Sequence, residues 1–323
     1  MSANPVAQQG VAGGRHGVDL DSWAYFGGEF VRLRDANVNI ATHALNYGTG
    51  VFEGIRAYWN PAQKQLYGLK VEEHYRRMER NCRLLKIRLP ESPAKLTEIT
   101  VELLRRNGFQ QDVYIRPIAF KSSLAIGVKL SGLEDAFGIF MAPMGDYIDT
   151  QKGLHLTVSS WRRLDDNDIP GRGKLTGSYL NAALAVDDAR SAGFDDAIML
   201  TADGHVSEGS AANLFMVREG RLITTPVTDA ILEGITRRAL MEMAGDLGIP
   251  VEVRTIDRTE LYLADELFLC GTGVQIAPVT QVDFRPVGDG KVGPIARRLQ
   301  QEYIAACRGE NERYRHWIVP VYA

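Results

Sequence analysis

Apolar residues recur along this chain in two spacings, which alternate from one segment to the next. Alternating or short continuous apolar runs predict β-strands, whereas apolar residues three or four positions apart predict helices. In the first half we predict strands over 23–31, 38–40, 113–118 and 136–144, a hairpin over 57–69, and helices over 71–87 and 96–106. The hairpin is expected to turn at Asn60-Pro61, and the second helix to end at Asn107-Gly108.

The second half continues this alternation of strands and helices. Strands are predicted over 154–161, 196–200, 213–217, 222–225, 251–255 and 266–270, and helices over 179–191, within 228–247 and over 293–307. The order predicts a mixed α/β fold. A polar, glycine-containing stretch suggests an interdomain loop over 144–152. It would separate a small N-terminal α/β domain over 19–143 from a larger C-terminal α/β domain over 153–323. A disordered leader over 1–18 would precede both domains.

Composition narrows the class of protein. Of the 323 residues, 45% are hydrophobic and 24% charged, as in ordinary globular proteins, and a net charge of −3 without a basic stripe argues against nucleic acid as a partner. No apolar run reaches the ~18 residues of a membrane span, and the N-terminus lacks the apolar core of a secretory signal. Three cysteines and six dispersed histidines lack metal-site spacing, so we expect no metal and a reduced, cytoplasmic protein.

One lysine stands among glycines and small residues in the stretch IPGRGKLTGSY, residues 169–179. This is Lys174, which lies between a predicted strand and a predicted helix. A lysine in this position can reach into a cavity between sheet and helix, where loss of water favours the neutral, nucleophilic amine. On this stretch alone a loop lysine in solvent is the simpler interpretation, so the rest of the chain has to decide.

Two glycine-containing turns, 233–236 and 271–273, stand where helices are expected to begin. The first turn of a helix offers unpaired N–H groups and the positive end of the helix dipole, which suit a phosphate. Each turn alone is weak evidence, since such caps are common. The nucleotide-binding motifs fit poorly, because Asp168 and Leu175 replace residues that a P-loop requires and no dinucleotide-binding glycine pattern follows a strand.

Three charged residues are expected at interior positions. Arg77 lies near the apolar face of the helix 71–87, and Arg116 shares a strand face with Tyr114 and Ile118. Arg77 can therefore point into an interior site, while the Arg116 guanidinium needs an anion, supplied either by a substrate carboxylate or by a structural salt bridge. Glu208 lies in a turn before a strand, where a buried carboxylate needs a cation. An imine-forming lysine, a phosphate cup and a carboxylate for a ring nitrogen together describe pyridoxal phosphate chemistry.

With these residues in place, the chain resembles the branched-chain amino acid aminotransferases, which are two-domain, fold-type IV pyridoxal-phosphate enzymes with a D-amino-acid-aminotransferase-like fold. The resemblance extends from residue 23 to about residue 309. Several motifs in the same order carry it: NYGTGVFEGIR at 46–56, YIRP at 114–117, Lys174 with Gly177 and Tyr179, SEGSAANLF at 207–215, LEGIT at 232–236, and LYLADE at 261–266 leading to Gly271-Thr272.

The resemblance implies a cofactor-binding role for a defined set of residues. Lys174 would hold pyridoxal 5'-phosphate covalently and move a proton between substrate and cofactor. Glu208 would pair with the pyridinium nitrogen, Tyr179 would hydrogen-bond the phenolic oxygen, and Leu232 would pack against the ring face. The phosphate would be bound by Arg77, Ile235, Thr236 and Thr272.

The resemblance also implies a homodimer, or a higher homo-oligomer, with an apolar substrate pocket beside the cofactor. Val128, contributed by the partner subunit, would close the pocket, while Arg116 and Tyr47 would take the side-chain carboxylate of glutamate. The residues implied for substrate binding are Tyr47, Phe52, Tyr114, Arg116, Val128, Met144, Tyr147, Gly271, Thr272 and Gly273. The expected reaction is transamination of L-leucine, L-isoleucine and L-valine with 2-oxoglutarate, giving branched-chain 2-oxo acids and L-glutamate.

Two positions depart from the pattern of this family. Met144 stands where many members have a large aromatic residue, and Gly273 stands where alanine is common. Both leave the substrate range open, so the alternative is an (R)-amine or D-amino acid transaminase, or an aminodeoxychorismate lyase, of the same fold group. The complete set of cofactor residues disfavours a non-catalytic binding protein on this scaffold. Arg172, two residues before the lysine, receives no role.

Overall fold

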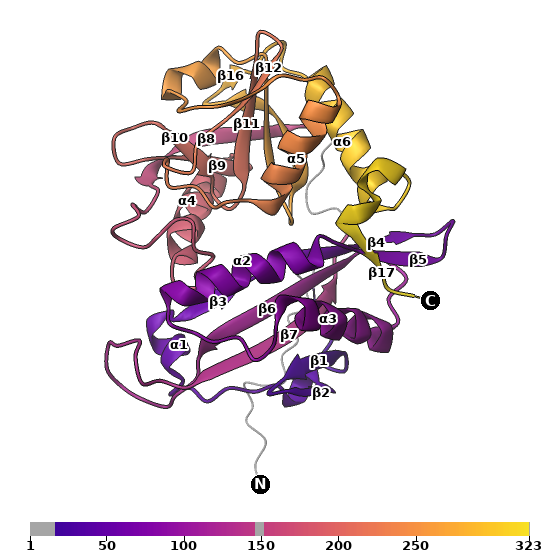
Figure 1. The fold of residues 1–323 in the computed structure, drawn as a ribbon. Helices are drawn as coiled ribbons and strands as arrows, with labels where there is room; N and C mark the ends of the chain where they lie inside the picture. The colour runs from indigo at the N-terminus through magenta and orange to yellow at the C-terminus, as the bar shows by residue number, and fades with distance from the viewer. Residues whose placement is uncertain (1–16, 146–151, 323) are drawn as a thin grey trace.

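The computed structural model describes residues 17–145 and 152–322, which form two β-sheets placed one above the other (Figure 1). Most of the predicted leader and most of the predicted interdomain loop lie outside these residues, as does Tyr147. The division into two domains therefore stays a prediction. Within the described residues, Cys82, Cys270 and Cys307 are buried free thiols.

The first sheet has the strand order β17-β5-β4-β6-β7-β1-β2, with β3 paired to β6. Its strands are β1 (Trp23–Phe26), β2 (Glu29–Arg32), β3 (Gly50–Phe52), β4 (Ile55–Asn60), β5 (Gln65–Leu69), β6 (Val113–Lys121), β7 (Asp135–Pro143) and β17 (Ile318–Pro320). The helices in this part of the chain are η2 (Leu33–Asp35, a 3-10 helix), α1 (His43–Tyr47), α2 (Val71–Leu84) and α3 (Pro93–Asn107).

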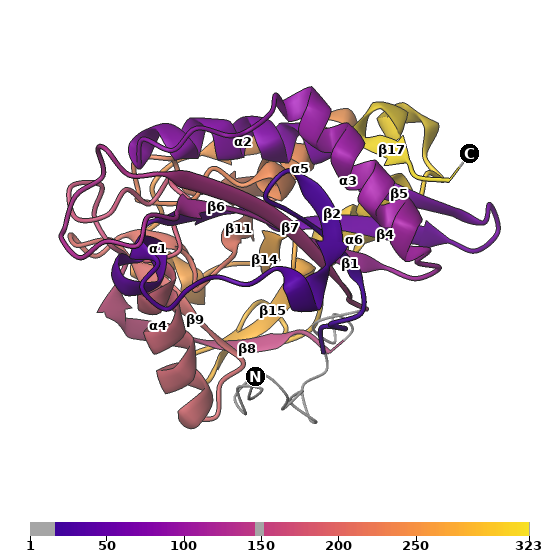
Figure 2. The ribbon, with the colours of Figure 1, turned by 90° about the horizontal axis from the view of Figure 1, so that it is seen from below.

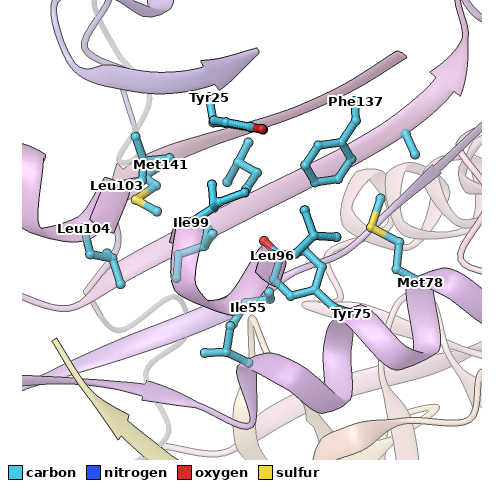
Figure 3. Close-up of a cluster of buried hydrophobic side chains, with 14 of the residues drawn as sticks. Tyr25, Ile55, Tyr75, Met78, Leu96, Ile99, Leu103, Leu104, Phe137 and Met141 are labelled. Carbon is cyan, nitrogen blue, oxygen red and sulfur yellow. The ribbon is translucent and has the colours of Figure 1, made fainter. Parts of the chain in front are cut away.

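One face of this sheet is apolar, and α2 and α3 cover it (Figures 2 and 3). Residues alternate along β6 as its sequence predicts. Val113 and Ile115 are fully buried in this core, whereas Tyr114 and Arg116 line a cavity on the opposite face. Figure 3 shows the packed side chains, which include Tyr25, Ile55, Tyr75, Met78, Leu96, Ile99, Leu103, Leu104, Phe137 and Met141.

The second sheet has the strand order β10-β9-β8-β15-β14-β11-β12-β13, with β16 paired to β15. Its strands are β8 (Leu154–Arg162), β9 (Asp196–Leu200), β10 (Val206–Gly209), β11 (Asn213–Arg218), β12 (Arg221–Thr224), β13 (Val251–Val253), β14 (Glu266–Gly271), β15 (Gln275–Val282) and β16 (Arg285–Pro286). The helices that accompany it are α4 (Tyr179–Ser191), α5 (Ile235–Asp246), α6 (Pro294–Cys307), η3 (Arg258–Tyr262) and η4 (Glu312–Trp317).

Most predicted elements are found within a few residues of their expected bounds, but three predictions are wrong. The segment 23–31 is not a single strand, because the chain turns at Gly27-Gly28 and β1 pairs with β2 as a hairpin. Residues 38–40 form no strand, because they belong to an exposed connection between η2 and α1. The turn 271–273 does not open a helix; it is the tight turn of the hairpin that pairs β14 with β15.

Strand β15 escaped prediction. It contains Pro278, a residue that argues against a strand inside a sheet. The chain also returns at its end to the first sheet, where β17 pairs with β5, although the sequence assigns that segment to the C-terminal domain (Figure 1).

The loop that carries Lys174 is hydrogen-bonded to β3 of the first sheet. The Phe52 N–H donates to the Lys174 carbonyl at 3.1 Å, and the Thr176 N–H donates to the Gly50 carbonyl at 2.8 Å. The Thr176 hydroxyl donates to the Gly48 carbonyl at 2.8 Å and accepts from the Gly50 N–H at 3.1 Å. These bonds fix the position of Lys174 relative to Phe52, although the two residues come from distant parts of the chain.

We predict that Thr176→Val lowers the free energy of unfolding by about 1 kcal/mol, because it removes a hydroxyl that hydrogen-bonds the backbone of Gly48 and Gly50. Urea unfolding monitored by circular dichroism measures the change. Thr259→Val, at an exposed threonine, is the control and should stay within about 0.5 kcal/mol of the parent protein. Equal losses in the two variants would show that the Thr176 hydroxyl does not hold the loop.

Candidate active site

A cavity of about 630 Å³ lies between the two sheets and is lined by residues of both. Its volume is typical of sites that bind small molecules. It brings together fourteen of the residues expected from the sequence: Phe52, Arg77, Tyr114, Arg116, Met144, Lys174, Tyr179, Glu208, Leu232, Ile235, Thr236, Gly271, Thr272 and Gly273.

Two expected pocket residues do not line the cavity of this chain, and one of them, Val128, was expected to come from the partner subunit. Tyr47 is 36% exposed, and its hydroxyl accepts a hydrogen bond from the Gly127 N–H at 3.1 Å. Val128, next to Gly127, is 90% exposed. Both side chains therefore lie together on a surface formed by α1 and the loop that follows β6, outside the cavity of this chain. The remaining expected residue, Tyr147, is not among the described residues.

The Lys174 amine lies at the centre of a small aromatic cluster. It donates a hydrogen bond to the Tyr179 hydroxyl at 2.5 Å and lies 4.9 Å from the centroid of the Phe52 ring. The Phe52 and Tyr179 rings are themselves 4.6 Å apart and pack edge to face. Tyr179 is the first residue of α4, so the start of this helix sets the distance between amine and hydroxyl.

Glu208 is a buried carboxylate with one ion-pair partner and two hydrogen-bond donors. Its Oε1 lies 2.6 Å from Arg163 Nη2, while its Oε2 accepts from Asn213 Nδ2 at 2.7 Å and from the Leu232 N–H at 3.2 Å. Burial raises the pKa of Glu208, and the Arg163 guanidinium offsets part of that rise. A carboxylate has about four acceptor positions, so this one can still accept a bond from a protonated ring nitrogen.

Arg77 and the start of α5 together line one part of the cavity. Arg77 Nη1 donates to the Glu233 carbonyl at 3.0 Å, just before α5 begins, and Ile235 and Thr236 form the first turn of that helix beside the cavity. Gly234 is required at the N-cap, because a Cβ there would lie 1.9 Å from Asn213 Oδ1. Free backbone N–H groups, the helix dipole and a guanidinium together suit a phosphate.

Arg116, on β6, is a further cation that lines the cavity. Arg116 Nη2 donates to the Tyr114 hydroxyl at 2.9 Å. Within 17–145 and 152–322 no carboxylate lies within 4.0 Å of the Arg116 guanidinium, which leaves it available to a substrate anion. Gly54 lets Tyr114 take its place, since a Cβ at that position would lie 2.2 Å from the tyrosine hydroxyl.

The two departures from the family pattern both lie at the cavity. Met144 and Gly273 line it. A Cβ at Gly273 would meet no atom within 4 Å, so alanine would fit there without a clash. Both positions are linked by Arg56, a buried residue for which no role was expected. Its Nη2 donates to the Met144 carbonyl at 2.7 Å, and its Nη1 to the Gly273 carbonyl at 3.4 Å.

Other residues of the site also escaped prediction. Arg163 lies in the short cluster Arg162-Arg163, and nothing local distinguishes it from its exposed neighbour. Glu53 lies within the motif at 46–56, yet the motif does not indicate that its carboxylate is fully buried against Arg77. Arg172 is half-exposed and pairs with Asp166 at 3.2 Å, which gives it a local structural role.

The set of groups fits pyridoxal phosphate. An amine, a hydroxyl beside it, a buried carboxylate and the start of α5 beside Arg77 all line the same cavity. These are the groups that an aldehyde, a phenolic oxygen, a pyridine nitrogen and a phosphate would each require. In the part of the chain that the structure covers, no group of three or more His, Cys, Asp or Glu side chains could hold a metal ion. The same residues contain no helix long and apolar enough to cross a membrane.

Comparison with known proteins assigns the chain to a class. The family described as amino-transferase class IV matches residues 50–282. The chain therefore belongs to the class IV aminotransferases.

Within that class, its relatives narrow the group. The "Probable branched-chain-amino-acid aminotransferase" of Aquifex aeolicus (strain VF5) is 46% identical over 93% of this chain and 97% of the relative. A solved branched-chain aminotransferase from Thermoproteus uzoniensis with norvaline is 41% identical, covers 93% of this chain and 99% of its own, and has a TM-score of 0.90. A solved branched-chain amino acid aminotransferase from Thermobaculum terrenum in its PLP form is 35% identical over 94% and 99%, with a TM-score of 0.89. The chain therefore belongs to the branched-chain-amino-acid aminotransferases. The predicted mixed α/β, fold-type IV class is confirmed.

We predict that Arg163→Met destabilises the cofactor-free protein by about 3 kcal/mol at pH 8, because it leaves the buried Glu208 carboxylate without its cation. The pKa of Glu208 in the folded protein already lies above its unfolded value and should rise further. The folded variant then binds a proton more readily, so the loss should be smaller at pH 5 than at pH 8. Urea unfolding at both pH values measures it.

The exposed Arg162→Met is the matched control and should change stability little at either pH. A loss in Arg163→Met that does not depend on pH would contradict the role of Arg163 as the counter-ion of Glu208.

Proposed function

We propose that this protein catalyses the reversible transamination of L-leucine, L-isoleucine and L-valine with 2-oxoglutarate, and that its cofactor is pyridoxal 5'-phosphate. The observation that carries the proposal is the convergence on one cavity of the Lys174 amine, the Glu208 carboxylate and the phosphate cup formed by Arg77 and the start of α5. Family membership supports the same reaction class.

The cofactor would be held at both ends by residues of this chain. Arg77 and the backbone N–H groups of Ile235 and Thr236 would bind its phosphate, with Thr272 beside them. Glu208, held by Arg163, would bind the ring nitrogen in its protonated form. When bound, pyridoxal phosphate supplies an aldehyde that takes up the amino group and a ring that accepts the electrons released at the substrate Cα. Leu232 would cover one face of that ring.

Lys174 would perform two tasks. Its amine would anchor the cofactor covalently and, once released from it, would move the proton that leaves the substrate Cα. Tyr179 supports both tasks, because its hydroxyl accepts a hydrogen bond from the amine and so holds it at one place in the cavity. The hydrogen bonds between β3 and the lysine loop restrict the same amine from the backbone side.

The substrate end of the cavity has to accept an apolar side chain and a carboxylate in turn. Phe52 and Met144 offer apolar walls for leucine, isoleucine or valine, while Arg116 offers a cation for the side chain of glutamate. The hairpin turn at Gly271–Gly273 lines the same cavity and would receive the α-carboxylate through its backbone. An arginine at the rim of an apolar pocket lets one site serve both substrates.

We predict that Lys174→Ala abolishes formation of L-glutamate from L-leucine and 2-oxoglutarate, a loss of at least about 10³-fold, because no other amine can replace the anchor and the proton carrier. A coupled glutamate assay measures the rate. Lys152→Ala, at an exposed lysine, is the control and should retain full activity. Activity of Lys174→Ala at the parent level would disprove the mechanism.

The same assay should be run with L-isoleucine, L-valine, D-alanine and (R)-1-phenylethylamine as donors. The three branched-chain L-amino acids should give the highest kcat/KM. A preference for D-alanine or the (R)-amine would replace the proposed reaction with that of another member of the fold group.

We further propose that the protein is a homodimer in the cytoplasm. An apolar patch supports the dimer: Ile40, Leu45, Leu124, Ile126 and Val128 are all more than 60% exposed. The two segments that carry them are held together, since Thr42 and Leu124 form a β-bridge and His43 Nε2 lies 3.0 Å from the Gly127 carbonyl. Exposed aliphatic side chains gathered in this way are typical of an interface. Buried free thiols fit a reducing compartment.

We predict that Ile126→Asp weakens or abolishes the dimer, because it places a charge in the middle of an apolar interface. Sedimentation velocity at micromolar concentration should show the mass of a monomer. Leu263→Asp, at another exposed leucine, is the control and should leave the dimer intact. A parent protein that sediments as a monomer would rule out the dimer itself.

A further inference from the structure

Glu53 is a fully buried carboxylate to which the reaction assigns no task. It follows β3 directly, and its neighbour Phe52 lines the cavity. Arg77 Nε donates to its Oε1 at 2.7 Å, and Arg77 Nη2 donates to its Oε2, also at 2.7 Å. His74 Nδ1 lies 2.8 Å from the same Oε2. An ionised carboxylate only accepts hydrogen bonds, so His74 is the donor.

This arrangement restrains the Arg77 guanidinium completely. A two-pronged bond to a carboxylate fixes both the position and the plane of a guanidinium. A third bond, from Nη1 to the Glu233 carbonyl at 3.0 Å, ties the same group to the start of α5. These bonds use three of the five N–H groups of an arginine. The two that remain belong to a residue that lines the cavity at the phosphate cup.

The charges of the cluster are balanced. Burial alone would raise the pKa of Glu53, but Arg77 and His74 hold it well below its usual range, so the carboxylate is ionised. Burial lowers the pKa of His74, and Glu53 offsets only part of that change, so the imidazole is neutral at pH 7. His74 therefore contributes a hydrogen bond without a charge. Because a neutral imidazole does not compete for the carboxylate as a cation, the ion pair stays between Glu53 and Arg77.

We propose that Glu53 is a positioning residue for the cofactor phosphate. Its carboxylate, supported by His74, fixes Arg77 so that the free N–H groups of the guanidinium are presented beside the first turn of α5. Without this support, Arg77 would be a flexible side chain that has to be ordered at the moment the phosphate binds, and that ordering would weaken binding. The inference rests on the proposed function, since it concerns the site that we assign to pyridoxal phosphate.

Two ligands that differ only in the phosphate test this role. The dissociation constants of pyridoxal 5'-phosphate and of pyridoxal are measured by absorbance titration of the cofactor-free protein. In Glu53→Gln the amide presents N–H groups to a guanidinium that only donates, so the two-pronged bond is lost. We expect Kd for pyridoxal 5'-phosphate to rise about tenfold, or about 1.4 kcal/mol, while Kd for pyridoxal changes less than about twofold.

Two further variants separate positioning from a general structural effect. Glu72→Gln removes a half-exposed acid of α2 that pairs with Arg76, and it should leave both constants unchanged. Arg77→Gln should weaken pyridoxal 5'-phosphate alone, and adding Glu53→Gln to it should cause no further loss, because Glu53 acts only through Arg77. Additive losses in the double variant would overturn the proposal.

The outcome also separates this inference from the proposed function. A parent protein that binds no pyridoxal 5'-phosphate would remove the proposed function. A parent protein that binds and transaminates, with equal changes for both ligands in Glu53→Gln, would overturn only the role of Glu53. Should Glu53→Gln fail to fold, His74→Ala tests the same support. It should weaken pyridoxal 5'-phosphate about threefold, without affecting pyridoxal, through the loss of one buried hydrogen bond, and an unchanged ratio of the two constants would count against the proposal.

Discussion

The candidate active site depends on the hydrogen bonds between β3 and the loop of Lys174. The lysine follows a strand of the second sheet, whereas Phe52, Arg77 and Tyr114 belong to the part of the chain that forms the first sheet. The cavity between the sheets is useful for chemistry only if the amine has a defined position relative to both. Backbone bonds at Gly50 and Phe52, with the Thr176 hydroxyl bridging two carbonyls and an N–H, provide that position. Such geometry is set before any ligand binds, as catalysis by orientation requires.

A second constraint is that each buried carboxylate at the site has an opposite charge beside it. Glu208 is paired with Arg163, and Glu53 with Arg77. Taking an unpaired charge out of water costs several kcal/mol, so neither acid would stay ionised alone. The pairs do more than offset this cost, because each directs one functional group. Arg163 holds the Glu208 carboxylate as an acceptor near Lys174, and Glu53 orients the Arg77 guanidinium as a donor near the start of α5. Arg116 differs from these pairs, since no carboxylate of residues 17–145 and 152–322 lies within 4.0 Å of its guanidinium.

The fold could be predicted from the sequence where local pattern and tertiary context agree. The alternation along β6 and the apolar face of α2 follow from spacing alone, and Gly108 ends α3 as expected. The segment 38–40 was misassigned because an apolar pair in an exposed connection looks like a strand. β15 was missed because Pro278 argues against a strand, and here a central strand tolerates it. The turn 271–273 has the composition of a helix cap, and only its pairing partners reveal a hairpin.

The sequence predicted some residues of the candidate site and missed others. Lys174 and Glu208 were expected because each stands in a motif with its own chemical logic, and Arg77 because it lies near the apolar face of its helix. Arg163, Glu53 and His74 were not, because their importance comes from contacts between residues far apart in the chain. Spacing in a sequence cannot report such pairs. Tyr47 shows the reverse case: it was expected at the pocket, yet in a single chain it is part-exposed and hydrogen-bonds Gly127 outside the cavity.

Every step of the proposed chemistry requires that Lys174 holds the cofactor, and a single experiment decides whether it does. The protein is loaded with pyridoxal 5'-phosphate, reduced with borohydride to make any covalent attachment permanent, digested and mapped by mass spectrometry. We expect a single phosphopyridoxyl group, on the peptide that contains Lys174 and on that lysine. Attachment at a different lysine, or a loaded and active protein with no attachment at Lys174, would contradict this role.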